Sequence, residues 1–284
     1  MKLPEIDPKI VKKEIISFIK EIKNRSNSFG VVIGLSGGID STIVAYLLKE
    51  AIGNENVYSY HLASSSTPKE DTEHARLIAK LLNVGYREID IDGISHEFLS
   101  LANDNNLANN DNIENNLANN IPSLENKTTE GNLKARIRMC LLYYFANLKN
   151  CLVSGTGNKS ELLIGYFTKY GDGACDFEPI GDIYKTQLMK LAKSWGIPKE
   201  IIDKPPRAGL WENQTDEDEI GFSYEVLDQL LLLITDKKLK NVDILKEMDI
   251  SSSEIDSVRD KIANNEHKLH SPPSPFENKK IVFK

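Results

Sequence analysis

The hexamer SGGIDS at residues 36–41 carries the clearest chemical signal in the sequence. It follows the apolar run VVIGL at 31–35, which is typical of a buried parallel strand, and it opens the helical stretch that ends at Gly53. A strand-to-helix turn of this kind points backbone N–H groups and the positive end of the helix toward an anion. Two glycines let the backbone approach that anion closely, and two serines add hydroxyl donors. The hexamer therefore predicts a polyphosphate site.

Asp40 within the hexamer predicts a metal ion beside the phosphates, because Mg²⁺ prefers carboxylate and phosphate oxygens. The loop lacks the Gly-Lys-Ser/Thr ending of a Walker A motif, so it is not the usual cradle of a γ-phosphate. A Gly-Gly pair after a strand is, on its own, only a tight turn. The complete hexamer between a strand and a helix is what favours the phosphate site.

The segments around the hexamer alternate between strand and helix patterns. Residues 8–25 place five isoleucines on one face of an amphipathic helix, namely Ile10, Ile15, Ile16, Ile19 and Ile22. Further strand patterns lie at 57–62, 86–91 and 151–155, and helix patterns at 69–85, 131–150, around 182–195, at 216–234 and near 251–263. This order predicts an α/β fold with a doubly wound, mostly parallel, Rossmann-like sheet flanked by helices.

The length of 284 residues suits a single α/β domain over 1–284, with two segments of different composition. Residues 101–120 hold ten Asn in twenty positions, and their apolar content is too thin for a core. We expect a solvated low-complexity insertion at about 101–122, for which neutral expansion of a surface loop is favoured over binding of a partner. The Pro-rich stretch at about 271–284 predicts a terminal extension that no helix crosses.

Composition narrows the class of protein. A net charge of −7 disfavours nucleic acid as a partner, so cations that hold an anionic ligand must be gathered locally. The chain has no run of 18 apolar residues, and its first residues lack the plan of a signal peptide, so no membrane association is expected. Three cysteines (Cys140, Cys151 and Cys175) without CxxC spacing favour a reducing, cytoplasmic setting.

The hexamer resembles the pyrophosphate loop of the ATP pyrophosphatases, which split ATP between its α and β phosphates. Other motifs narrow the resemblance: GNLKAR at 131–136, GTGNKSE at 155–161, GYFTKYGDG at 165–173, Asp176, AGLWE at 208–212 and QTDEDE at 214–219. Together they resemble the signature of the ammonia-dependent NAD synthetases over roughly 7–100 and 127–270. The resemblance implies an adenine-nucleotide alpha-hydrolase-like fold. It also implies ATP-dependent amidation of deamido-NAD with ammonia, through an adenylated carboxylate, to give NAD, AMP and pyrophosphate.

The same resemblance implies roles for individual residues. Asp40 and Glu161 would ligate Mg²⁺, and Lys185 would neutralise charge on the departing pyrophosphate. Ammonium must also lose a proton in this reaction, and Asp172 or Asp176 is a candidate acceptor for it. Contacts with ATP are implied for Gly34, Leu35, Ser36, Gly37, Gly38, Ile39, Asp40, Ser41, Thr156, Lys185 and, as a guanidinium that reaches a phosphate, Arg207. Contacts with deamido-NAD are implied for Arg136, Lys169, Asp176, His267 and Lys268.

The resemblance further implies a homodimer whose interface helps to form the dinucleotide site. The nitrogen source is expected to be free ammonia, or ammonia from a separate subunit, because the sequence leaves no residues for a glutamine amidase domain. Three positions depart from the family pattern: Arg207 replaces the usual Ser or Thr, Ala63 a frequent Pro, and Leu269 a common Arg. These departures concern affinity more than the type of reaction.

Read one at a time, several of these residues have ordinary interpretations. Lys169, Lys185 and His267 belong to types that usually lie on a solvated surface. The acidic run at 216–219 also suits a helix N-terminus, where carboxylates oppose the dipole. The aromatic residues at 143–145 are interpreted as core residues rather than as a platform for nicotinamide.

Two other functions stay open. Another ATP pyrophosphatase, amidating or tRNA-modifying, would be expected to carry a basic, aromatic nucleic-acid face or a CxxC pair, and the sequence has neither. A non-catalytic sensor of adenine nucleotides would be expected to have lost the metal carboxylates, and Asp40 and Glu161 are present.

Overall fold

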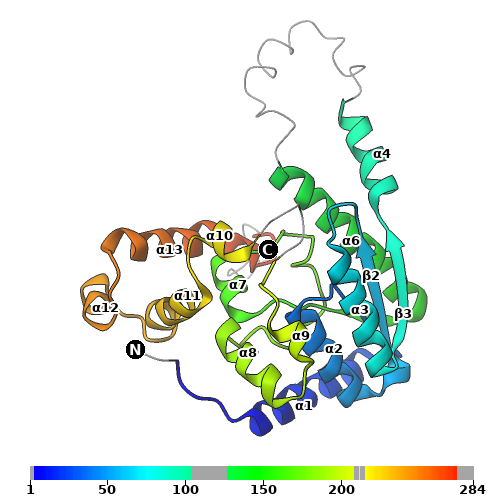
Figure 1. Cartoon of the computed structure of the whole chain (residues 1–284), viewed down its shortest axis with the longest axis horizontal. Helices are drawn as coiled ribbons and strands as arrows, with labels where there is room; N and C mark the ends of the chain where they lie inside the picture. The colour runs from blue at the N-terminus through cyan, green and yellow to red at the C-terminus, as the bar shows by residue number, and fades with distance from the viewer. Residues whose placement is uncertain (1–2, 104–126, 208–210, 212–214, 274–284) are drawn as a thin grey trace, which may run out of the picture.

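A parallel four-stranded sheet forms the centre of the computed structural model, which describes residues 3–103, 127–207, 211 and 215–273 (Figure 1). The strands are β1 (Gly30–Gly34), β2 (Val57–Ala63), β3 (Gly85–Asp90) and β4 (Cys151–Ser154). Their spatial order is β3-β2-β1-β4, and every neighbouring pair is parallel. The chain winds outward from β1 to β3 and returns to the other side of β1 with β4, so a topological switch point lies between β1 and β4. The predicted doubly wound sheet is confirmed.

Helices make up most of the remaining described residues. They are α1 (Pro8–Ser26), α2 (Ile39–Ile52), α3 (Lys69–Leu82), α4 (Asp92–Asn103), α6 (Lys127–Lys149), α7 (Lys159–Ile164), α8 (Lys185–Ser194), α9 (Lys199–Ile202), α10 (Asp216–Ile220), α11 (Tyr224–Leu231), α12 (Asn241–Glu247) and α13 (Ser252–Asn265). Short turns η1 (Asn54–Asn56) and η4 (Glu266–Lys268) are 3₁₀-helical, and η3 (Leu232–Asp236) is π-helical. Within the described ranges, no helix combines the length and the apolar character that crossing a bilayer requires.

Both faces of the sheet are covered because side chains alternate along each strand. Val31 and Ile33 of β1 join a core built with α1, α2, α3 and α8. Val32 points to the opposite face, where it packs in a cluster with residues of β2, β4 and α6. Burial on both faces explains why β1 reads as a continuous apolar run.

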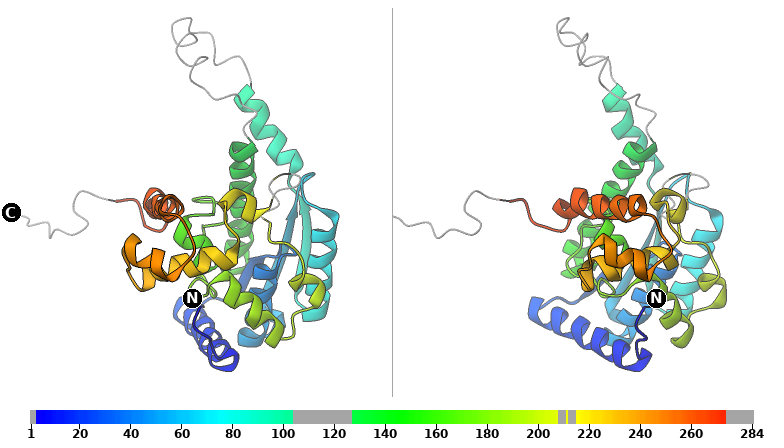
Figure 2. Two further views of the ribbon diagram at one scale, coloured as in Figure 1. Left: turned by 60° about the vertical axis from the view of Figure 1, so that its left-hand side comes forward. Right: turned by 90° about the vertical axis from the view of Figure 1, so that its left-hand side faces the viewer.

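A third hydrophobic cluster lies beyond the sheet, among α7, α10, α11, α12 and α13. Figure 2 shows α10 to α13, coloured yellow to red, packed together on one side of the molecule, away from β2 and β3. One cavity is lined both by residues of the sheet and by residues next to this cluster, such as Tyr166 and Asp216.

Two helix predictions need correction. Ile10 was expected on the buried face of the first helix, but its side chain is 61% exposed, and Ile15 and Ile19 alone of the five are buried. The single helix expected at 216–234 is broken after Ile220. Gly221 takes φ +82°, a left-handed conformation that ends α10, and α11 begins at Tyr224.

The insertion predicted at 101–122 lies mostly outside the described residues. Its first three positions, 101–103, form the end of α4, a helix that was not predicted. In the predicted tail at 271–284, residues 271–273 belong to no helix, and 274–284 lie outside the described residues.

Candidate active site

A cavity of ≈ 470 Å³ opens at the carboxyl end of the sheet, where the loops after β1 and β4 face each other. This is the position at which open α/β sheets bind their ligands. All but one of the residues implied as ATP contacts line it: Gly34, Leu35, Ser36, Gly38, Ile39, Asp40, Ser41, Thr156, Lys185 and Arg207. The exception is Gly37, whose backbone turns against α3.

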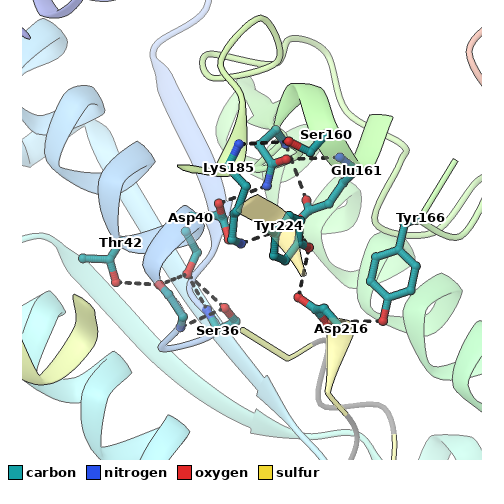
Figure 3. A network of polar contacts seen from close by, with 12 residues as sticks. Ser36, Asp40, Thr42, Ser160, Glu161, Tyr166, Lys185, Asp216 and Tyr224 are labelled. Carbon is teal, nitrogen blue, oxygen red and sulfur yellow. Dashed lines mark hydrogen bonds and ion pairs between the residues drawn. The ribbon is translucent and has the colours of Figure 1, made fainter. Parts of the chain in front are cut away.

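The SGGIDS loop is held in shape by its own hydroxyl groups (Figure 3). The Ser36 N–H donates to Ser41 Oγ at 3.2 Å, and the Gly38 N–H donates to Ser36 Oγ at 3.2 Å. Gly38 is the N-cap of α2, and its carbonyl accepts the Thr42 N–H at 3.1 Å and the Thr42 hydroxyl at 2.8 Å. The N-terminus of α2 therefore faces the cavity with a rigid loop around it, as a phosphate site requires.

Gly37 is the residue in this loop that no other amino acid can replace without strain. Its φ is +84°, and a Cβ there would lie 2.1 Å from the Asp71 carbonyl oxygen. The loop can therefore pack this closely on α3 only with a glycine at this position.

Lys185 joins the two loops of the cavity through an ion-pair cluster. Its Nζ donates to Asp40 Oδ2 and, at 3.3 Å, to Glu161 Oε1 (Figure 3). Asn158 adds a second link, because it caps α7 by accepting the Glu161 N–H and donates from Nδ2 to Asp40 Oδ1 at 3.3 Å. The Lys185 side chain is only 1% exposed, so a solvated surface position is ruled out for it.

The charges of this cluster are set by burial and by each other. Burial alone would lower the pKa of Lys185, but the Asp40 and Glu161 carboxylates beside it raise that pKa above its ordinary value. Burial raises the pKa of Glu161, the nearby Asp40 and Asp216 carboxylates add to the rise, and Lys185 opposes it. Lys185 is therefore a stable cation that holds the Asp40 and Glu161 side chains together.

Tyr224 and Asp216 extend the cluster and were not assigned a role from the sequence. The Tyr224 hydroxyl lies 3.3 Å from Glu161 Oε1 and 3.4 Å from Asp216 Oδ2. Asp216 also accepts the Tyr166 hydroxyl at 3.3 Å, and it is buried. Asp216 opens α10, so the helix N-terminus interpretation of the acidic run is confirmed, and the same residue also lines the cavity.

Two further cations, Lys204 and Arg207, line the cavity beside α3. Lys204 donates from Nζ to the Gly37 carbonyl at 3.1 Å and to Asp71 of α3. Arg207 donates to the same Asp71 at 2.7 Å and to Glu70 at 2.9 Å. Lys204 was not singled out in the sequence, although it directly precedes the Pro-Pro pair that ends its segment. The two side chains place positive charge around the SGGIDS loop, with Asp71 as their shared counter-ion.

The structure separates the two carboxylates considered as proton acceptors. Asp172 lines the cavity, and the Thr168 N–H donates to it at 3.0 Å. Desolvation raises the pKa of Asp172, and that hydrogen bond opposes the rise. Asp176 does not line the cavity; it accepts the Val153 N–H at 2.7 Å and the Tyr143 hydroxyl at 3.2 Å. Asp172 is therefore the one of the two placed to reach a ligand in the cavity.

The residues implied for deamido-NAD divide into two groups. Lys268 lines the cavity and donates to the Gly165 carbonyl at 2.6 Å and the Phe167 carbonyl at 3.0 Å. Arg136, Lys169 and His267 lie outside the cavity lining but contact one another: Arg136 donates to the Lys169 carbonyl, and Lys169 Nζ donates to the His267 carbonyl at 2.6 Å. These three side chains form one basic group at the surface.

The aromatic run at 143–145 is not uniform. Phe145 is buried and stacks on Tyr60 of β2 with ring centroids 4.3 Å apart, as expected of a core residue. Tyr144 is 61% exposed, so the core interpretation is wrong at that position. Tyr143 lies partly buried against the same cluster as Phe145.

Glu178 lies behind the loop after β4 and supports it. Its Oε2 accepts the Gly157 N–H at 3.0 Å, and its Oε1 lies 3.2 Å from Cys175 Sγ. A Cβ at Gly155 would lie 2.3 Å from the Glu178 carboxyl carbon, so the glycine leaves the space that this side chain fills. Burial raises the pKa of Glu178 to about 7, although the two hydrogen bonds oppose the rise.

The raised pKa of Glu178 predicts that stability falls as pH rises from the ordinary pKa of a glutamate toward neutrality. Between the unfolded pKa and the folded pKa of about 7, the folded state holds a proton that the unfolded state has released, so stability falls across this window and the loss is complete above it. Glu178→Gln keeps the acceptor for Gly157 but cannot ionise. We expect the variant to match the wild type at about pH 4.5 and to melt at a higher temperature at about pH 8. Equal melting temperatures of the two proteins at both pH values would contradict the assignment.

Comparison with known proteins agrees with this geometry. The family model described as NAD synthase matches residues 11–272. The NH(3)-dependent NAD(+) synthetase of Methanocaldococcus jannaschii is 46% identical over 263 residues, which cover 92% of this chain and 95% of that protein. The corresponding protein of Methanosarcina acetivorans is 45% identical over 264 residues, 92% of this chain and 95% of that protein.

Two solved structures are similar over nearly the whole chain. NH3-dependent NAD synthetase from Campylobacter jejuni superimposes with a TM-score of 0.75 at 33% identity, covering 95% of this chain and 99% of that one. NMN synthetase from Francisella tularensis superimposes with a TM-score of 0.78 at 30% identity and the same coverage. With a family model that spans nearly all of its length and relatives this similar, the chain belongs to the NAD synthase family.

Proposed function

We propose that this chain amidates the nicotinate carboxylate of deamido-NAD with ammonia, and that it consumes ATP to AMP and pyrophosphate. The Asp40–Lys185–Glu161 cluster beside the SGGIDS loop, at the switch point of the sheet, is the observation that carries the proposal. Relatives that are 45–46% identical bear the name NH(3)-dependent NAD(+) synthetase, which supports ammonia as the nitrogen donor.

The reaction needs two chemical steps. The nicotinate carboxylate first attacks the α-phosphorus of ATP, which forms a mixed anhydride with AMP and releases pyrophosphate. Ammonia then attacks the activated carbonyl, and AMP leaves. The chain offers positioning and fixed charge rather than a covalent nucleophile. The N-terminus of α2 and the Lys185 ammonium face the same cavity, where they would stabilise the charge that builds up on the pyrophosphate. Asp172 is the proposed acceptor for the proton that ammonium must lose.

Mg²⁺ fits the donor set at the mouth of the two loops. Asp40 and Glu161 offer hard carboxylate oxygens, and their side chains are 19% and 17% exposed toward the cavity. No described group of three His, Cys, Asp or Glu residues is placed to hold a metal unaided, so phosphate oxygens and water would complete the coordination. This division of ligands is usual for Mg²⁺ at phosphate-transfer sites. Bound there, the ion would offset the negative charge of the phosphates.

The experiment is NAD formation from deamido-NAD, ATP and Mg²⁺, with ammonium or glutamine as the donor. Product with ammonium and none with glutamine is the expected result. Asp40→Ala and Glu161→Ala should each remove the activity. If ATP binds without forming any amide, the chain is a nucleotide sensor instead. The same assay with tRNA or another carboxylate as acceptor tests the remaining ATP pyrophosphatase reaction.

Nicotinate mononucleotide is the second candidate substrate, because one similar structure is an NMN synthetase. The surface group of Arg136, Lys169 and His267 favours the dinucleotide, since it offers cations beyond the cavity for the second half of a longer ligand. A ratio of kcat/KM values that favours deamido-NAD supports this assignment. A ratio that favours the mononucleotide would move these three side chains out of the substrate site.

Arg207 is proposed to contact ATP in place of the hydroxyl expected at this position. Arg207→Ser is predicted to raise KM for ATP by about tenfold, a loss of ~1.4 kcal/mol, with kcat little changed, because a cation near the phosphates is removed. Glu70→Gln is the control: it removes one ion-pair partner of Arg207 and leaves the guanidinium, so KM for ATP should not rise. An unchanged KM in Arg207→Ser would show that the guanidinium serves α3 alone.

We also propose a homodimer of single-domain subunits that work in the cytoplasm. Tyr144 and Leu148 stand one turn apart on α6, 61% and 69% exposed, and Phe29, 70% exposed, is tied to the end of that helix by its N–H bond to the Asn150 carbonyl. An exposed apolar group of this kind favours association with a second copy.

Two further observations bear on the subunit and its setting. The cavity shared by the sheet and the C-terminal helices supports a single domain. Three free cysteines suit a reducing compartment.

A further inference from the structure

Asp228 is a fully buried carboxylate that the reaction described above does not use. It lies on α11 with 0% exposure and does not line the cavity. Its Oδ1 accepts the Ser160 hydroxyl, and its Oδ2 accepts the Thr186 N–H at 2.8 Å and the Thr186 hydroxyl at 2.7 Å. A buried charge is costly unless hydrogen bonds and nearby charges compensate it, and this one is bonded through both oxygens.

The partners of Asp228 are the sequence neighbours of two proposed active-site residues. Ser160 directly precedes Glu161 at the start of α7, and Thr186 directly follows Lys185 at the start of α8. Ser160 Oγ also accepts the Lys185 N–H at 2.9 Å. The first backbone donors of α8 are therefore satisfied by side chains of α7 and α11, and the negative charge of Asp228 lies at the positive end of α8.

The same face of α11 also contacts Glu161, which lines the cavity, one turn earlier. Tyr224 and Asp228 are four positions apart, so their side chains lie on one side of the helix. The Tyr224 hydroxyl contacts the Glu161 carboxylate at 3.3 Å, and the Lys185 Nζ lies 5.3 Å from the centre of the Tyr224 ring. Helix α11 thus contacts the sequence neighbours of Glu161 and Lys185 through Asp228, and it contacts the side chains of Glu161 and Lys185 themselves through Tyr224.

We infer that Asp228 is a positioning residue that sets the separation of Glu161 and Lys185 by fixing the starts of α7 and α8. This inference rests on the proposed function of the Asp40–Lys185–Glu161 cluster. Because the distance between the Glu161 carboxylate and the Lys185 ammonium is short, a small shift of either helix changes the charge around the phosphates at the step where pyrophosphate leaves. Asp228 acts through these residues and touches no substrate.

The test compares Asp228→Asn, Ser160→Ala and the double variant with the wild-type chain. Asparagine has nearly the same shape as aspartate, but its side chain has a single acceptor oxygen. The two oxygens of Asp228 accept hydrogen bonds from the Ser160 hydroxyl, the Thr186 N–H and the Thr186 hydroxyl. We expect kcat to fall by about 10–100-fold, as for other residues that orient active-site groups, with KM for deamido-NAD within about twofold. The double variant should lose no more than the more affected single variant, because both changes break one linked set of hydrogen bonds.

Ile244→Ala is the matched control for a purely structural effect. Ile244 of α12 is fully buried in the hydrophobic cluster of the C-terminal helices. It takes no part in the hydrogen bonds that join Asp228 to Ser160 and Thr186. It should lower the melting temperature and leave kcat unchanged at an assay temperature at which all variants are folded. An Asp228→Asn protein that is folded and has wild-type kcat overturns the inference, as does an equal loss of kcat in Ile244→Ala.

If Asp228→Asn does not fold, Ser160→Ala alone decides the question, because it breaks the link to both Asp228 and the Lys185 N–H while leaving the carboxylate in place. A wild-type chain that forms no NAD contradicts the proposed function instead, so the two failures are distinguishable.

Discussion

Lys185→Met is expected to lower kcat by about 10²–10³-fold, because it removes a preorganised cation from the site where charge on the pyrophosphate is proposed to build up. The variant should also lose stability by ~3–5 kcal/mol, since the partly buried Asp40 and Glu161 carboxylates then face each other without the fully buried counter-charge of Lys185. Initial rates of NAD formation and chemical denaturation measure the two effects separately.

Mg²⁺ should restore part of the stability lost in Lys185→Met, because a divalent ion can replace the missing positive charge between the two carboxylates. We expect the melting temperature of this variant to rise more with Mg²⁺ than that of the wild type. Lys190→Met, an exposed lysine on the same helix, is the control and should change neither activity nor stability. Activity within twofold of wild type in Lys185→Met would remove Lys185 from the proposed mechanism.

Gly37→Ala is expected to abolish ATP binding and activity. The added methyl group would lie 2.1 Å from the Asp71 carbonyl oxygen, and the backbone at φ +84° already disfavours a side chain. The loop must then move away from α3, which also separates Gly37 from Lys204. The stabilisation that ATP gives to the wild type in a thermal shift experiment should be absent from the variant.

Gly196→Ala isolates the contribution of backbone strain. Gly196 has a similar φ of +76°, but a Cβ there meets no atom within 4 Å. This control should lose only about 1 kcal/mol of stability and keep full activity and ATP binding. If Gly37→Ala behaves like Gly196→Ala, the close packing of the loop on α3 is not required for function.

The sequence was most informative where local chemistry and hydrophobic pattern agree. The strands and the first helices follow from apolar runs, caps and glycines, and SGGIDS predicts the phosphate loop because each of its residues has a local reason to be there. Helix α7 was missed, although Asn158 and Glu161 form a capping box that could have indicated its start.

The parts of the site that depend on distant contacts could not be predicted. Lys204 has a sequence neighbourhood like that of many surface lysines, and only the packing of its segment against α3 places it at Gly37. Tyr224 reads as a core aromatic residue, and its contact with Glu161 depends on how α11 docks on α7. Whether Asp172 or Asp176 reaches the cavity is decided by the path of the loop between them, for which composition carries no signal.

The pairing of β1 with β4 has a consequence for the order in which the chain folds. The β1–β4 pair, in which Gly30 lies beside Cys151, joins the most distant segments in the described sheet, whereas the β1–β2 and β2–β3 pairs join strands much nearer in sequence. Closing so long a loop is entropically costly, so β4 is expected to join the sheet after the N-terminal strands. Asp40 and Glu161 come from the two sides of that last pairing. A chain in which β4 has not yet paired with β1 therefore lacks the complete Asp40–Lys185–Glu161 cluster. Such a partly folded chain should not hydrolyse ATP.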